Sequence, residues 1–229
     1  MREPNIHQAG VRAFLLTSPL GVYWLLNGYF VSKLNPLVLL LVDFVFVVLG
    51  TLASLFLLRP VLGDVLRELG LVTSPRAGAR KILEDSVVCT LVLLFAGWFV
   101  STLAWAYLWR VDWVRTSELA FSWNKVSASL GARVPIAFYL AVSAAFAEEI
   151  YFRGVLRIVV SSMFAPRIAS NTYCFVSAAY FSAIHWEGGL TLMITMFVWG
   201  FIAARLFIWT KDLRPLIVAH FCAAMVQLV

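Results

Sequence analysis

Charged residues are scarce in this sequence. Lysine, arginine, aspartate and glutamate make up 13% of its 229 residues, whereas 62% are hydrophobic. Soluble domains carry about a quarter of charged residues, so this composition, with a mean hydropathy of +0.89, excludes an ordinary soluble protein. Long polar stretches are also missing, which leaves no room for a sizeable soluble module. We therefore predict an all-α integral membrane protein that forms a single transmembrane domain over residues 1–229.

Several sequence patterns that would indicate other functions are absent. The cysteines, Cys89, Cys174 and Cys222, fall inside apolar runs without CxxC spacing, so we interpret them as small core residues. No HExxH zinc motif, glycine-rich phosphate loop or internal repeat occurs. The net charge of +6 comes without a basic and aromatic recognition pattern, so no nucleic-acid partner is expected.

Long apolar runs are what the sequence does have. A helix needs about 20 such residues to cross a bilayer, and the first run lacks the small-residue cleavage site of a signal peptide. Seven spans are predicted, at residues 12–32, 37–58, 86–109, 135–160, 170–187, 189–209 and 214–229. Because the soluble loops are short, any chemistry must lie in a polar cavity at the centre of the bundle.

Basic residues distribute unevenly between the loops. With the N-terminus inside, 13 lysines and arginines fall on the cytoplasmic side and 5 on the other. The positive-inside rule therefore predicts an N-in, C-out protein, which we assign to the cytoplasmic membrane of a prokaryote. The polar segment 110–133 carries Trp113 and Trp123 and is predicted to anchor at the membrane interface.

One cluster of charges interrupts the fourth predicted span, where residues 147–154 read AEEIYFRG. Buried charges in a membrane are costly and mark functional sites with a partner to be identified. On a helix, Glu149 and Arg153 lie about 40° apart and can form an ion pair. Glu148 lies about 140° from Arg153. It is thus expected to have no local partner and to be free to accept a proton.

Two histidines occupy similar apolar surroundings. His185 ends the run YFSAIH and His220 lies in PLIVAHFCAAMVQL, whereas His7 lies in the polar N-terminal tail. Together with Glu148 they place three proton-transfer groups on three different spans. Such a set in a bundle with few other charges predicts a catalytic cavity rather than isolated packing histidines.

These motifs resemble a known family. EEIYFR, from Glu148 to Arg153, is similar to the EExxxR motif of the CAAX protease and bacteriocin-processing membrane proteases, and FSAIH resembles their FxxxH motif. The third resemblance is the late histidine, His220, after an apolar run. The likeness covers residues 134–229, so residues 1–133 are predicted to be additional spans and loops.

The resemblance implies a glutamate-dependent intramembrane endopeptidase. Glu148 would be the general base, His185 would hold and polarise the attacking water, and His220 would face the oxyanion. Glu149 and Arg153 match the remaining motif positions and are assigned supporting roles. The implied partners are the lipid bilayer and a membrane-associated peptide or protein, such as a CAAX-type, leader or sorting-tail substrate. No cofactor and no metal are implied.

The sequence departs from the family at one position. The last family motif is HxxxN, but the fourth residue after His220 is Ala224. An oxyanion donor contributes roughly 3 to 4 kcal/mol to the barrier elsewhere. Gln227, seven residues after His220 and on the same helix face, is the first candidate to replace it, and Asn171 is the second.

Two other functions stay open at this point. Glu148, His185 and His220 have ligand types that suit zinc, which would make the protein a membrane metalloprotease. Alternatively, the chain is a non-catalytic relative or a transporter whose buried acid and histidines bind a ligand or relay protons. Ala224 is the observation that favours this second alternative.

Overall fold

The computed structural model describes residues 6–33, 36–62, 64–72, 78–108 and 130–228. Within these ranges every regular element is a helix, which confirms the all-α prediction. The elements are α1 (Ile6–Lys33), α2 (Pro36–Val42), the π-helix η1 (Asp43–Leu49), α3 (Gly50–Leu62), α4 (Val65–Glu68), α5 (Ala79–Leu108), α7 (Leu130–Glu148), the π-helix η3 (Glu149–Val155), α8 (Leu156–Met163), α9 (Pro166–Ala183), the 3₁₀-helix η4 (Trp186–Gly188), α10 (Gly189–Thr210) and α11 (Leu213–Leu228).

Four of the predicted spans are confirmed as helices that are long and apolar enough to cross a membrane. They are Leu40–Arg59, Ala79–Leu108, Val134–Met163 and Trp186–Thr210. The apolar helices Gly10–Leu26 and Leu213–Leu228 are shorter. Length and composition thus support four candidate spans in the described part of the chain, and the other three predicted spans are not confirmed. Most of the predicted interfacial segment, 110–133, lies outside the described residues.

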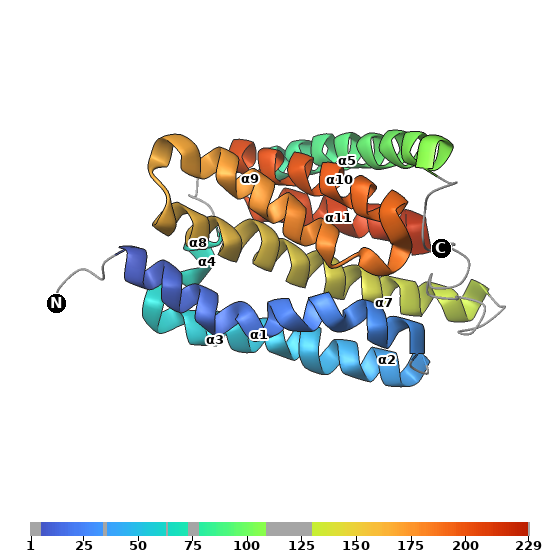
Figure 1. The fold of residues 1–229 in the computed structure, drawn as a ribbon, viewed down its shortest axis with the longest axis horizontal. Coiled ribbons are helices and arrows are strands. Elements are labelled where there is room, and N and C mark those ends of the chain that lie inside the picture. The colour runs from blue at the N-terminus through green and yellow to red at the C-terminus, as the bar shows by residue number, and fades with distance from the viewer. Residues whose placement is uncertain (1–5, 34–35, 63, 73–77, 109–129, 229) are drawn as a thin grey trace.

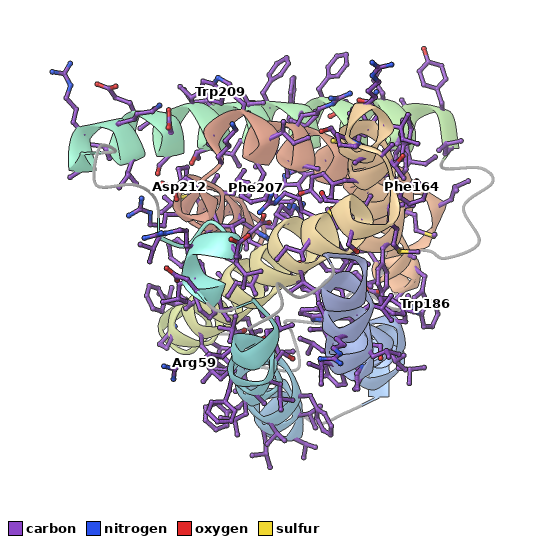
Figure 2. All side chains as sticks on the ribbon, turned by 90° about the vertical axis from the view of Figure 1, so that its left-hand side faces the viewer. Arg59, Phe164, Trp186, Phe207, Trp209 and Asp212 are labelled. Carbon is purple, nitrogen blue, oxygen red and sulfur yellow. The ribbon has the colours of Figure 1, made fainter. Side chains whose placement is uncertain are left out.

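The helices form layers, with the motif-bearing helix in the middle. In Figure 1, α5 lies at one edge and α1, α2 and α3 lie at the opposite edge. The continuous rod of α7, η3 and α8 lies between them, and α9, α10 and α11 fill the space toward α5. Figure 2, turned by 90°, gives the same order. The AEEIYFRG cluster is therefore placed at the centre of the bundle.

Small residues allow these helices to approach one another. Ala137, Ala141 and Ala145 repeat every four residues along α7 and are fully buried in a bundle where α7 packs against α11. A side chain at Gly200 of α10 would come within 3.3 Å of the Ala178 backbone on α9. Close packing of small residues is the main way in which helices associate in lipid.

The first helix packs directly onto the motif. The Trp24 ring of α1 lies 5.1 Å from the Tyr151 ring and 5.4 Å from the Phe152 ring, measured between centroids. The Trp186 indole also donates a hydrogen bond of 2.9 Å to the carbonyl of Leu25. The N-terminal helices and the predicted protease core therefore belong to one packed unit.

The outer face of α5 is apolar and exposed. Phe95, Trp98 and Trp105 project from it without protein neighbours that cover them, as expected for a surface that faces lipid. By contrast, Cys89 of α5 and Cys174 of α9 are buried, and all three cysteines are free. The predicted role as core residues is confirmed for Cys89 and Cys174, whereas Cys222 is partly buried.

Candidate active site

The motif adopts a π-helix rather than the α-helix that its spacing suggested. All seven residues of η3, from Glu149 to Val155, are buried. The Leu156 amide donates to the Tyr151 carbonyl, which is the five-residue spacing of a π-turn. Such wide turns in α-helices occur frequently at functional sites. The helix thus changes its winding just after Glu148.

Glu149 and Arg153 form the predicted ion pair. Arg153 Nε lies 3.2 Å from Glu149 Oε2, and both side chains are fully buried. The guanidinium lies over two rings, with its carbon 4.6 Å from the centre of Phe181 and 5.3 Å from that of Trp199. Its nitrogens have no aligned hydrogen bond within the described residues, so charge and aromatic faces hold it in place.

His220 joins the two glutamates. Its Nδ1 lies 2.9 Å from Glu149 Oε1, and because a carboxylate only accepts, Nδ1–H is the donor. Its Nε2 lies 3.8 Å from Glu148 Oε2. Glu148 therefore has no partner on its own helix, as predicted, but it faces a histidine of α11. Trp199 supports the imidazole edge-on at 4.9 Å between ring centroids.

His185 is fixed by its own helix. Its Nδ1 lies 2.7 Å from the carbonyl oxygen of Phe181, four residues earlier, so Nδ1–H donates there and Nε2 keeps its lone pair. The Phe181 ring also lies 4.8 Å from the imidazole. In the FxxxH motif, the first and last residues are thus one turn apart and in contact.

A small pocket of about 130 Å³ connects the two histidines. Its lining includes Phe181, His185, Trp199, His220, Ala224 and Gln227. Gln227 therefore lies at the same pocket as both histidines, beside the alanine that replaces the family asparagine. Among the described residues, no group of three or more histidine, cysteine or acidic side chains is arranged to hold a metal ion.

Asn171 lies elsewhere. Its Oδ1 accepts a hydrogen bond of 2.8 Å from Arg205, in an exposed position near the start of α9. His185 follows it by fourteen residues, which is about 21 Å along a helix. The structure therefore does not bring the Asn171 amide together with the two histidines, and Gln227 stays the first candidate for the oxyanion donor.

Two residues near the site were missed in the sequence. Trp199, in the middle of an apolar span, packs against both Arg153 and His220. A tryptophan away from the membrane interface is unusual and was a usable signal. Asp43, the acid within the second predicted span, lies beside Tyr139 and Ser143 and near enough to Glu148 to interact with its charge. It begins η1, the other π-helix.

Comparison with curated proteins and with solved structures gives no match. A family model described as type II CAAX prenyl endopeptidase Rce1-like matches residues 130–226, somewhat under half of the chain. The matched segment begins at α7 and includes Glu148, His185 and His220. The segment that carries every predicted catalytic residue is therefore similar to the Rce1-like type II CAAX prenyl endopeptidases.

Proposed function

We propose that the protein is a glutamate-dependent intramembrane endopeptidase that cleaves a membrane-associated peptide. The observation that carries this proposal is the arrangement of His220, which bonds to Glu149, faces Glu148 and lines a pocket with His185. The remaining apolar helices, α1, α9 and α11, are proposed to cross the bilayer as well. The pocket would then be the intramembrane polar cavity.

Glu148 is assigned as the general base because the charge of Glu149 is already balanced. Arg153 and the Nδ1–H of His220 both contact Glu149, whereas among the described residues the ion-pair contact of Glu148 is His220 Nε2 at 3.8 Å. In the proposed reaction, Glu148 takes a proton from water and the hydroxide attacks the scissile carbonyl carbon. The same proton then passes to the leaving amide nitrogen as the C–N bond breaks.

His185 is suited to hold the attacking water. Because its Nδ1–H donates to the Phe181 carbonyl, Nε2 is an acceptor and can bind a water hydrogen. His185 and His220 line the same pocket. A water bound to His185 would therefore lie where a peptide in that pocket can meet it. Phe181, the motif partner of His185, thus selects the tautomer that the role requires.

The oxyanion role of His220 requires its imidazolium form. Nδ1–H is already donated to Glu149, so only a second proton on Nε2 can bond to an oxyanion. With His220 protonated, the formal charges of Glu148, Glu149, Arg153 and His220 sum to zero. In this form, Nε2–H is the donor that would bond to the oxyanion of the tetrahedral intermediate.

Gln227→Ala is expected to lower turnover by about 10-fold or more, less than the loss of a well-placed oxyanion donor elsewhere. The amide lines the pocket beside Ala224 and is the candidate replacement for the missing asparagine. Ala224→Asn should restore part of the lost rate, provided that the larger side chain fits. The measurement is kcat on a cleaved peptide with each variant in the same detergent.

Asn171→Ala is the matched control, because it removes the same amide chemistry at the far end of α9. Its turnover should equal that of the wild type. A silent Gln227→Ala variant would show that the oxyanion donor is a different group, such as a backbone amide.

The family match favours a prenylated CAAX-type peptide as substrate, and this choice can be tested together with the metal question. Purified protein should cleave a prenylated CAAX peptide, and the activity should survive exhaustive chelation because glutamate and histidine activate the water directly. Leader and sorting-tail peptides serve as the comparison substrates. Stoichiometric zinc that is lost together with activity would instead favour the metalloprotease. Failure to cleave any of the three peptides would favour the non-catalytic alternative.

A further inference from the structure

A second pocket lies at the end of the bundle where α4, α8, α9 and α10 meet. It has a volume of about 350 Å³, within the range of small-molecule sites. Neither His185 nor His220 is among its lining residues. The side chains that matter for its chemistry are Arg67, Arg157, Ser161, Ser170, Phe207 and Lys211.

Positive charge distinguishes this pocket from the rest of the bundle. Arg67, Arg157 and Lys211 line it, and no carboxylate is among the lining residues. Asp212, next in sequence, is paired with Arg214 at 2.7 Å and does not neutralise the pocket. Arg67 contacts Asp64 at 3.4 Å, but both side chains are mostly exposed, so that pair is weak.

Arg157 is held in place by part of its guanidinium, and another of its N–H donors is unused within the described residues. Its Nη2 donates a bond of 2.6 Å to the carbonyl of Glu68, and its guanidinium lies over the Phe207 ring at 5.5 Å. Its Nε is buried and has no hydrogen-bond partner in the described part of the chain. Hydroxyls of Ser161 and Ser170 lie in the same lining. Fixed cations with hydroxyl donors are the chemistry that binds phosphate groups.

The backbone around this pocket is specified by unusual conformations. Gly70 has φ of 76°, and a Cβ there would come 3.0 Å from the Phe207 ring. Lys211 is left-handed with φ of 55°, which is uncommon for a residue other than glycine. The Leu213 amide donates to the Gly70 carbonyl at 2.7 Å and ties the α4 loop to the turn before α11. The wall that carries Lys211 is thus fixed against Phe207.

The predicted N-in orientation places this end of the molecule on the cytoplasmic side of the membrane. Figure 2 faces this end of the molecule and shows Phe207 and Asp212 close to α4. Two further cations of the predicted cytoplasmic loops, Arg59 in the last turn of α3 and Arg80 in the first turn of α5, flank α4 along the chain. Basic pockets between helices on the cytoplasmic side bind the head groups of anionic lipids. We propose that this pocket binds the phosphate group of an anionic phospholipid.

The experiment measures binding of phosphatidylglycerol to the purified protein in detergent by native mass spectrometry. Phosphatidylcholine, which carries the same phosphate with a cationic choline, is the reference lipid. Each lost cation should weaken phosphatidylglycerol binding by about fivefold. The variants are Arg157→Gln, Arg67→Gln and Lys211→Asn, since asparagine tolerates the left-handed backbone.

Arg80→Gln is the matched control, because it removes a cation at the same end but outside the pocket, where Arg80 pairs with exposed Glu84. The Arg80→Gln variant should bind phosphatidylglycerol as tightly as the wild type. If Arg157→Gln does not fold, Ser170→Glu tests the same pocket by adding a negative charge at an exposed position. Its phosphatidylglycerol binding should fall by more than fivefold.

Inorganic phosphate separates the two possible sources of the phosphate group. Phosphatidylglycerol binding that depends on the pocket cations, with no effect of phosphate, supports a lipid occupant. Inorganic phosphate that binds with the same dependence while the lipid does not supports a soluble phosphate instead. Binding that is unchanged in the pocket variants, or reduced equally by Arg80→Gln, overturns the proposal. None of these readouts requires the protein to be a protease.

Discussion

Glu148→Gln is expected to abolish peptide cleavage while the protein still folds and inserts. Glutamine keeps the size and shape of the side chain but cannot accept the proton of the attacking water. The Glu148 side chain is 13% exposed, and the ion-pair contact that the described residues give it is with His220 Nε2, at 3.8 Å. In the variant, His220 keeps its Nδ1–H bond to Glu149, and Glu149 stays paired with Arg153, so the buried Glu149–Arg153 pair is left intact. Cleavage rate and thermal unfolding are both measured, with wild type as the reference.

The matched control is Glu84→Gln, the same change at an exposed acid on α5 that pairs with Arg80. It should leave cleavage unchanged. If Glu148→Gln kept the wild-type rate, the base would be another carboxylate, and Asp43 would be the next to test. Asp43 interacts with the charge of Glu148 from the neighbouring span, so Asp43→Asn would then separate the two acids.

Local spacing predicted one contact of the site and missed the others. The i,i+4 separation of Glu149 and Arg153 was enough to predict their ion pair, because both lie on one helix face. The His220 bond to Glu149 links residues 71 apart. No periodicity carries that information, and only the packing of α11 on α7 brings the two side chains together.

The π-helical winding of the motif could not be predicted from the sequence either. A π-turn satisfies the same backbone groups as an α-turn with one more residue, so composition does not distinguish them. The winding still matters for the site, because all seven residues of η3 are buried, including a glutamate and an arginine. Hydropathy, by contrast, located the four long spans, since a run of apolar residues is a direct measure of length in lipid.

Glu149→Gln is expected to destabilise the fold by about 3 to 5 kcal/mol, because it leaves the Arg153 guanidinium buried without a countercharge. Both side chains of the pair are fully buried, and within the described ranges the guanidinium otherwise contacts aromatic rings. The glutamine can still accept the hydrogen bond from His220, so the change tests charge rather than hydrogen bonding. The free energy of unfolding in detergent is the measurement.

The double variant Glu149→Gln with Arg153→Met distinguishes a buried charge pair from a set of independent contacts. Removing both charges should recover most of the lost stability, because a buried pair contributes little net free energy once its desolvation cost is counted. Turnover should stay low even so, because the His220 imidazolium no longer faces two carboxylates. The corresponding exposed pair, Glu84 and Arg80, should change stability by less than about 1 kcal/mol in the same substitutions. A double variant as unstable as Glu149→Gln alone would mean that Arg153 acts mainly by packing on Phe181 and Trp199, and the ion pair would then not be the feature that fixes the motif.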